Sequence, residues 1–262
     1  MERVYENRFA QTMAMDQDLT LTFNERSAGS IVLFLEGQCQ EMTLHLEAKS
    51  ACHAKVFIQN CMEHEVQLKL TANIASDANL ECGLLDMQNQ PCHLDLQGHL
   101  NQQGANMDFS IAQLCLSDIE KKSNLDITSH VSHTYGNMHN FAVVFDGGKY
   151  EMVASGRIVK GAYASESHQE TRVLTMGSNH KCVTLPILYI DEDDVKASHA
   201  LSVGQPDAEQ LYYLNSRGLT MRQAIGLLSV GYFKPILELI EDEQLKAKIE
   251  QETEERVGMY EH

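Results

Sequence analysis

Short segments in which apolar and polar residues alternate fill the chain from about residue 19 to residue 188. Clear examples are LTLTF from residue 19, VQLKLTANI from residue 66 and CHLDLQGHL from residue 92. Alternation of this kind is typical of strands with one buried face, and helical periodicity is absent from this part of the chain. Polar clusters such as NERSAG and NQQGAN separate the segments at intervals of about ten residues. The pattern predicts a mainly β core, which can be a sandwich, a barrel or a β-solenoid.

The pattern changes after Gly204, where helix start and stop signals replace the alternation. Asp207 is expected to cap a first helix, and Gly218 supplies the left-handed residue that ends it. Thr220 with Gln223 three residues on forms a capping box and opens a second helix. These signals predict a helical segment after the β core.

The second helix is expected to run to about Val230 and to stop at Gly231. Pro235 is then placed to start a third helix, which Gly258 can end. This third helix is crowded with acidic residues, which indicates a solvated face or a docking surface for a partner.

We therefore expect three parts: an N-terminal segment over residues 1–18, a β core over residues 19–204 and a small helical domain over residues 205–262. A chain of 262 residues can bury a substantial core without disulfides or metals. The β core is expected to stay folded when residues 206–262 are removed.

A net charge of −17 argues against nucleic acid and against an anionic membrane surface, because both recruit clustered Lys and Arg. The N-terminus has no apolar signal-peptide region, and no window approaches the length of a membrane span. The composition therefore predicts a soluble, cytoplasmic protein with a protein partner.

The seven cysteines are expected to be free thiols, because their number is odd and no secretory signal is present. None forms a C-x-x-C pair. Cys61 with His64, and His180 with Cys182, come nearest to metal-ligand spacing, but structural zinc sites usually have paired ligand clusters. The acidic run at residues 192–194 could ligate a hard cation, but it is interpreted as a charged turn before a strand.

Motifs for nucleotide binding or hydrolysis are missing from the sequence. It has no P-loop, no H-E-x-x-H and no G-x-S-x-G, and Gly147 with Gly148 lies between two strand-like segments as a turn. His130 and His133 are three apart in an alternating segment and would lie on opposite faces of a strand, so they cannot easily share a ligand.

A series of motifs in the second half of the chain resembles a known family. DDVKASHA, SVGQ and LYYLNSRGL follow one another between residues 193 and 219, and FAVVFDGGKYEMVASG precedes them from residue 141. This series, over roughly residues 125–240, is similar to the SufB/SufD scaffold proteins of the SUF iron–sulfur cluster assembly system. The resemblance implies a right-handed parallel β-helix core with a small C-terminal α-helical domain.

The resemblance is closer to SufD than to SufB. The positions that match the sulfur-handling cysteine and the two glutamates of SufB-type subunits hold Thr171, Ser198 and Ala200. A hydroxyl or a methyl group cannot replace a reactive thiolate. Cys182 is a nearby thiol, about eleven residues beyond Thr171, that could act in a displaced position.

The family implies a non-enzymatic scaffold that pairs with a SufB-type subunit and docks the SufC ATPase through its C-terminal helices. His199 matches a histidine at the subunit interface and is a possible ligand of a transient iron–sulfur cluster or iron; no tightly bound cofactor is expected. Ala197 replaces a cysteine that many members have. The candidate docking residues for the ATPase are Ile225, Leu228, Tyr232 and Phe233.

Two alternatives remain at this point. One is a homodimeric SUF scaffold without a SufB-type partner. The other is a β-solenoid enzyme acting on carbohydrates, which would need two carboxylates at a set separation. The complete lack of tryptophan removes the commonest surface for sugar stacking.

Overall fold

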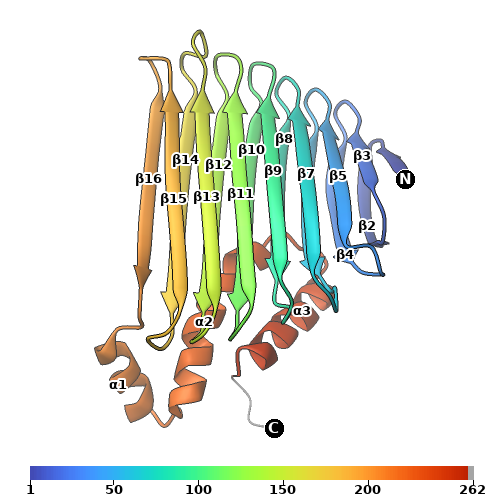
Figure 1. Cartoon of the computed structure of the whole chain (residues 1–262). Helices are drawn as coiled ribbons and strands as arrows, with labels where there is room; N and C mark the ends of the chain where they lie inside the picture. The colour runs from blue at the N-terminus through green and yellow to red at the C-terminus, as the bar shows by residue number, and fades with distance from the viewer. Residues whose placement is uncertain (259–262) are drawn as a thin grey trace.

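Consecutive strands of the chain alternate between two parallel sheets, as the computed structural model shows for residues 1–258 (Figure 1). The odd-numbered strands form one eight-stranded sheet in the order β1 to β15, and the even-numbered strands form a second one from β2 to β16. Neighbouring strands within each sheet are parallel, and the residues of one coil pair in register with those of the next. The arrangement is a parallel β-solenoid, which confirms the predicted β class and its solenoid form.

The two sheets have the following strands. The odd sheet contains β1 (Glu2–Tyr5), β3 (Leu19–Phe23), β5 (Glu41–Ala48), β7 (Val66–Ile74), β9 (Cys92–Leu100), β11 (Glu120–Ser129), β13 (Lys149–Ile158) and β15 (Lys181–Ile190). The even sheet contains β2 (Arg8–Met15), β4 (Ala28–Leu35), β6 (His53–Asn60), β8 (Asn79–Asp86), β10 (Asn106–Cys115), β12 (Tyr135–Val144), β14 (Glu166–Thr175) and β16 (Lys196–Gly204). Because β1 and β2 already belong to the sheets, the solenoid begins before the predicted boundary at residue 19.

Alternation along each strand builds the main core between the two sheets. In β7, every second residue from Val66 to Ile74 is buried, while Lys69 between them is exposed. Period-two alternation places successive side chains on opposite faces of a sheet, so one apolar row per strand fills the interior. At the N-terminal end, the rings of Tyr5, Phe9 and Phe23 lie 5.0–5.7 Å apart and close this core.

One corner of each coil repeats a left-handed backbone conformation. Its residues have φ between 54° and 76°, and each N–H donates to a carbonyl of the next coil. These corner residues are Arg26, Ala51, Asp77, Gly104, His133 and Ala164. The repeat is therefore one of backbone geometry and not of residue type, which explains why the sequence shows no strict repeat.

The coils become longer along the chain. Hydrogen-bonded neighbours on adjacent coils are 26 residues apart between β5 and β7, 29 between β9 and β11, and 31 between β12 and β14. Figure 1 shows the strands lengthening from the N-terminal end toward β16. The solenoid consequently has a narrow first coil and a wide last one.

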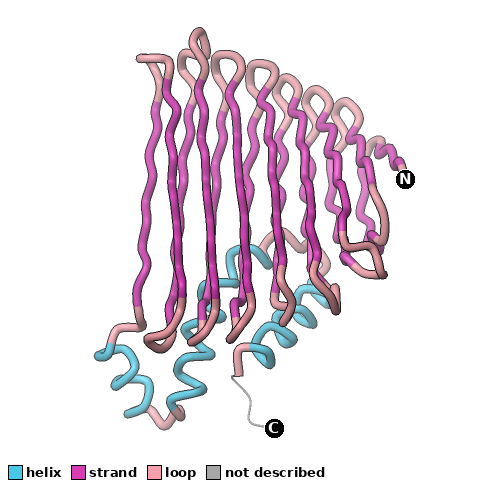
Figure 2. Tube along the Cα trace, in the orientation of Figure 1, coloured by secondary structure: helices cyan, strands magenta, loops and turns pink. Residues whose placement is uncertain are grey.

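Helices α1 (Ala208–Ser216), α2 (Met221–Leu237) and α3 (Glu243–Arg256) follow β16. Figure 2 shows them, in cyan, gathered on one side of the strands, where α2 packs on β8, β10 and β12 of the even sheet. This packing forms a second apolar core on the outer face of that sheet. Its buried residues are Val32, Phe57, Leu85, Met87, Ala112, Leu114, Phe141, Val143, Leu174, Met176, Val230, Phe233, Ile236, Leu237, Ile240, Ile249 and Val257. Removal of residues 206–262 would uncover this apolar face of the β core.

The locally encoded helix ends are confirmed. The Asp207 carboxylate accepts a backbone N–H of the first turn of α1, and Thr220 and Gln223 form the reciprocal capping box at the start of α2. Gly218 and Gly258 have φ of 97° and 84° where α1 and α3 end. Within residues 1–258, no helix is both long and apolar enough to cross a membrane.

The predicted end of the second helix at Gly231 and the start of a third at Pro235 are wrong, because both residues lie inside α2. Proline in a helix loses the bond to the carbonyl four residues earlier, which here belongs to Gly231. Phe233, Ile236 and Leu237 are completely buried against the even sheet. Their burial offsets the cost of the proline in the last turn, since each such side chain contributes about 1.5–3 kcal/mol.

Candidate functional site

The last coil leaves the interior of the solenoid open at its C-terminal end. In the described part of the chain, β15 pairs with β13 and β16 with β14, and no strand lies beyond them. Leu201 and Val203 of β16 are 44% and 45% exposed, although their register partners Thr171 and Val173 on β14 are buried. The apolar inward row therefore continues into solvent here, in contrast to the aromatic closure of the other end.

His199 lies in the same inward row of β16 and is exposed. Its register partner is the buried Gln169, whose side-chain amide donates to the backbone carbonyl of Ile187 on β15 at 2.9 Å. Within residues 1–258, no hydrogen bond or ion pair engages the imidazole of His199. Both ring nitrogens are therefore accessible at the mouth of the solenoid.

The three positions that distinguish SufD-like from SufB-like sequences lie on two faces. Thr171 is buried inside the solenoid and accepts the Asn140 amide at 3.0 Å. Ser198 and Ala200 alternate with His199 and lie on the outer face, where the Ser198 hydroxyl contacts His168 Nδ1 at 2.7 Å. The outer face beside His199 is therefore polar and already hydrogen-bonded.

Strand β15 is apolar on its outer face as well. Leu185 and Tyr189, on that face, are 52% and 42% exposed, and the Arg157 guanidinium lies 4.3 Å from the centre of the Tyr189 ring. Sheets of water-exposed proteins normally carry polar residues on the solvent side. The last coil therefore presents apolar surface on its open edge and beside it.

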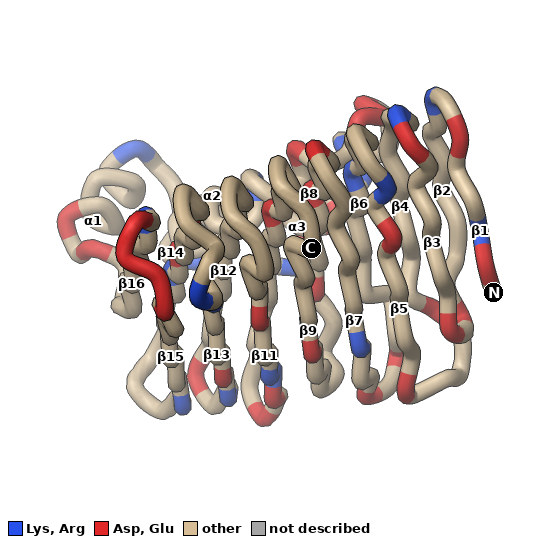
Figure 3. The backbone as a smooth tube through the Cα atoms, turned by 90° about the horizontal axis from the view of Figure 1, so that it is seen from above, with Lys and Arg blue, Asp and Glu red and all other residues tan. Residues whose placement is uncertain are grey.

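The acidic run between β15 and β16 borders this open end, and Figure 3 shows it as a continuous red segment beside β16. Glu192 accepts the backbone N–H groups of Gly161 and Asp193 at 2.9 and 3.0 Å. These two bonds, that of Gly161 first, lower the pKa of the Glu192 carboxyl. The run serves as a hydrogen-bonded corner, in agreement with its interpretation as a charged turn.

The thiols near the candidate sites are poor nucleophiles. Cys182 is half-buried on β15, next to the buried Tyr150 on β13, and burial raises the pKa of its thiol to about 11. Burial also raises the pKa of Cys61 to about 11, and both ring nitrogens of His64 contact backbone carbonyls. A protonated thiol is neither a nucleophile nor a ready metal ligand. No group of three or more His, Cys, Asp or Glu side chains in residues 1–258 is placed to hold a metal ion.

The four predicted docking residues differ in accessibility. Phe233 is completely buried between α2, to which it belongs, and the even sheet, so a partner could reach it only if the helix left the sheet. Ile225, Leu228 and Tyr232 are partly exposed at the border of the second core. Two tyrosines of α1, which no sequence pattern singles out, are more accessible: Tyr212 and Tyr213 are 77% and 55% exposed, on a helix with no buried residue.

A cleft of about 450 Å³ lies between α2 and the outer face of the even sheet, and it joins these residues to charged ones. Its lining residues are Ser110, His139, Phe141, Glu170, Arg172, Leu228, Gly231, Tyr232 and Pro235. The His139 imidazole lies 3.4 Å from the carboxylates of both Asp108 and Glu170. The hydrogen bond to Asp108 is the main reason that the pKa of His139 is raised, and the cleft thus combines apolar residues of α2 with a cluster of paired charges on the sheet.

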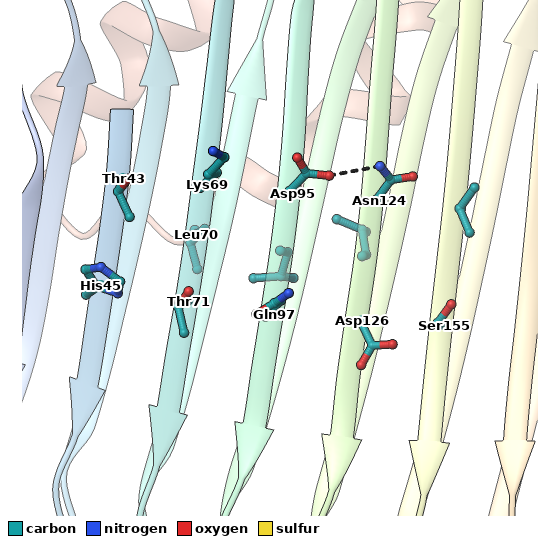
Figure 4. A pocket seen from close by; sticks show the side chains of 13 residues that line it. Thr43, His45, Lys69, Leu70, Thr71, Asp95, Gln97, Asn124, Asp126 and Ser155 are labelled. Atoms are coloured by element: carbon teal, nitrogen blue, oxygen red, sulfur yellow. Dashed lines mark hydrogen bonds between the residues drawn. The ribbon is translucent and has the colours of Figure 1, made fainter. Parts of the chain in front are cut away.

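A groove of about 570 Å³ crosses the outer face of the odd sheet (Figure 4). Asp95 on β9 and Asp126 on β11 point into it, and each accepts a hydrogen bond at 2.9 Å, from Asn124 and Thr128 respectively. None of the described residues that line it is Phe, Tyr or Trp. The groove has two carboxylates, as a glycosidase needs, but lacks these usual side chains for sugar stacking.

The fold and these surfaces define a class: a parallel β-solenoid closed at one end, open and apolar at the other, with helices packed on one sheet. The family model for the SUF system FeS cluster assembly SufBD core domain matches residues 16–232. The chain belongs to this SufBD family, and it is SufD-like.

Individual relatives match a part of the chain. SufD of Bacillus subtilis (strain 168) is 40% identical over 102 residues, which are 39% of this chain and 23% of that protein. SufD of Escherichia coli (strain K12) is 31% identical over 107 residues, or 41% of this chain and 25% of the relative. A SufBD family protein of Mycobacterium tuberculosis (strain ATCC 25618 / H37Rv) is 31% identical over 129 residues, 48% of this chain and 15% of the relative. The matched segments thus span a quarter or less of the length of these relatives.

Proposed function

We propose that the protein is a non-catalytic scaffold subunit for iron–sulfur cluster assembly, which pairs with a SufB-type subunit through its open last coil. Its membership of the SufBD family supports the role in cluster assembly. The observation that carries the pairing is the exposed inward row of β16, because an apolar solenoid interior normally needs a cap or a partner.

Pairing at this end satisfies two needs of the last coil. Leu201 and Val203 gain burial, at roughly 25 cal/mol for each Å² of apolar surface removed from water. The free edges of β15 and β16 carry unpaired N–H and C=O groups, which a strand of the partner can bond. A solenoid with a similar open end offers both the apolar row and the strand edges.

His199 is proposed to ligate the nascent cluster, or iron, as the substrate of assembly. It lies in the row that pairing would bury, its imidazole has no partner within residues 1–258, and imidazole nitrogen is a competent iron ligand. The partner would supply the remaining ligands, because the thiol of the same coil, Cys182 at the start of β15, has a pKa raised to about 11 by burial.

The ATPase of the system is proposed to dock on α1 and on the free side of α2. Tyr212 and Tyr213 give α1 an exposed aromatic surface, and Ile225, Leu228 and Tyr232 continue it along α2. Phe233 contributes indirectly by holding α2 on the sheet. Aromatic anchors of this kind dominate the binding energy of many interfaces.

Substitution at the open end tests the pairing. Leu201→Glu should abolish co-purification with a co-expressed SufB-type subunit, because it places a charge in a buried apolar contact. Val4→Glu is the matched control, since Val4 is 53% exposed on β1 at the opposite end. Light scattering after gel filtration gives the mass of each complex. If Leu201→Glu pairs as well as the wild type, the proposal is contradicted. If the chain alone forms a dimer and Leu201→Glu makes it monomeric, the homodimeric scaffold is favoured.

His199→Ala tests the cluster role separately. The complex should form with wild-type mass and thermal stability but should lose its iron and acid-labile sulfide, and His199→Cys should retain a part of both. Iron and sulfide per purified complex are the measurements. A wild-type cluster content in His199→Ala would contradict a ligand role, whereas loss of the complex itself would make His199 an interface residue only.

The groove of the odd sheet is the one observation that favours a carbohydrate-active enzyme. The scaffold proposal expects the isolated chain to hydrolyse neither polysaccharides nor ATP. If the pure chain hydrolysed a glycoside and Asp126→Asn abolished this activity, the result would support a carbohydrate-active enzyme instead.

A further inference from the structure

Two histidines from adjacent coils meet on the outer face of the odd sheet. His99 lies near the end of β9, and His130 directly follows β11, the neighbouring strand. The His130 backbone N–H donates to the Leu100 carbonyl at 3.0 Å, which continues the strand ladder and fixes His130 beside His99. His99 Nδ1 and His130 Nε2 are 3.2 Å apart, and the ring centroids are 5.4 Å apart.

This separation suits two ligands of one metal ion. Zinc binds imidazole nitrogen at about 2.0–2.1 Å with tetrahedral geometry, which places two ligating nitrogens roughly 3.3–3.4 Å apart. In the metal-free protein one ring donates an N–H to the other. On metal binding, the proton of the donating ring moves to its other nitrogen, so both neutral rings present a lone pair and no net proton is released.

The charges around the pair suit a cation. Asp126 lies four residues before His130 on the same outer face of β11, so its carboxylate brings negative charge to the neighbourhood of the pair. Arg157, on the next strand, is held over the Tyr189 ring of β15.

We propose that His99 and His130 form a surface site for a divalent first-row transition metal ion of the zinc type, completed by water. Two protein ligands leave the remaining positions open, so the ion is exchangeable and not structural. The metal links two coils through β9 and β11 and should therefore stabilise the folded chain, because it binds the folded state preferentially. This inference does not rest on the proposed function.

Zinc titration of the full chain, followed by calorimetry, tests the site. His99→Gln and His130→Gln should each weaken one binding event by about tenfold or more, since losing a ligand costs at least as much as losing an outer hydrogen bond to one. His93→Gln is the matched control: His93 lies on the outer face of the same strand, β9, and pairs in register with Gln67 and Lys122. That variant should bind zinc like the wild type.

Thermal unfolding gives a second readout. Zinc should raise the midpoint of the wild type and of His93→Gln, but not that of the two site variants, and all four proteins should unfold alike in a chelator. Equal zinc affinity of His99→Gln and the wild type overturns the proposal. An equal loss of affinity in His93→Gln also overturns it, because zinc would then bind surface histidines without selection.

Discussion

Ala51 occupies a corner where the backbone is left-handed, with φ of 57°, and its N–H donates to the Ser76 carbonyl at 2.8 Å. A residue with a Cβ atom pays about 1–2 kcal/mol for this conformation, whereas glycine adopts it freely. Gly104 occupies the same corner two coils later, with φ of 76°. The corner thus selects a conformation and tolerates several residue types that adopt it.

Ala51→Gly should stabilise the protein by about 0.5–1 kcal/mol, because the relief of strain exceeds the extra entropy of glycine in the unfolded chain. Gly104→Ala should have the opposite effect, since an added Cβ atom would lie 2.2 Å from Asp77 Oδ1. Urea unfolding measures both changes. Stabilisation by Gly104→Ala, or a loss of stability in Ala51→Gly, would show that strain does not control these corners.

The buried environment of Lys121 is also not evident from the sequence. Its ammonium is completely buried inside the solenoid, 2.8 Å from Asp86 Oδ2, and it donates to the carbonyls of Gln88 and Gln90 at 2.9 and 2.7 Å. The Asn60 amide donates to the other oxygen of Asp86 at 2.9 Å. Charges in an apolar interior are tolerated only when paired and hydrogen-bonded in this way.

Lys121→Met should therefore destabilise the protein by about 3–5 kcal/mol, because it leaves the Asp86 carboxylate buried without a counter-charge. Combining it with Asp86→Asn should recover a large part of that loss, since the amide keeps the oxygen that Asn60 contacts. Denaturant unfolding of the wild type, both single variants and the double variant provides the thermodynamic cycle. A double variant no more stable than Lys121→Met would exclude the unpaired carboxylate as the cause.

At the scale of elements, α2 is positioned by the sheet under it. The helix continues through Gly231 and Pro235 because Phe233, Ile236 and Leu237 bury themselves against the even sheet. The start of α2 is encoded locally by the Thr220 and Gln223 capping box, whereas its end depends on packing against the sheet. The same packing makes the helices a cover for the even sheet, so removing them would expose its apolar outer face.

Substitutions on two faces of α2 should separate packing from docking. Phe233→Ala should cost about 3–5 kcal/mol, because it opens a cavity in a completely buried site. Leu227→Ala, on the same helix but 40% exposed, should change stability little. Thermal and denaturant unfolding give the comparison. A small cost for Phe233→Ala would mean that α2 is held on the sheet by something other than this core.

At the scale of the whole molecule, the two ends of the solenoid are different. The narrow N-terminal coil is closed by Tyr5, Phe9 and Phe23, whereas the wide C-terminal coil exposes Leu201 and Val203. A stack of coils must end its apolar interior in some way at each side. Closure at one end and exposure at the other give the molecule a direction, with the candidate interface and His199 at the open end.

The alternating pattern by itself determined the strands whose inward rows are apolar. VQLKLTANI and CHLDLQGHL coincide with β7 and β9, since each has one continuous apolar face. Strand β14 gives a weaker signal, because its inward row includes Ser167, Gln169 and Thr171, all buried. Their polar groups are accommodated by neighbours such as Asn140 and the Ile187 carbonyl, which only the stacked coils supply.

The sequence also determined the helix caps, because a cap depends on neighbours along the chain. It determined the resemblance to the SufBD family and the place of His199 within it, because these depend on an ordered series of motifs. Tertiary structure alone decided which residues meet across coils. His130 meets His99, 31 residues earlier, and not His133, because the coil places Thr128 in register beside His99 and His130 follows two residues later on the same face. Coil length, burial under α2 and the open end result from stacking, and no local pattern encodes them.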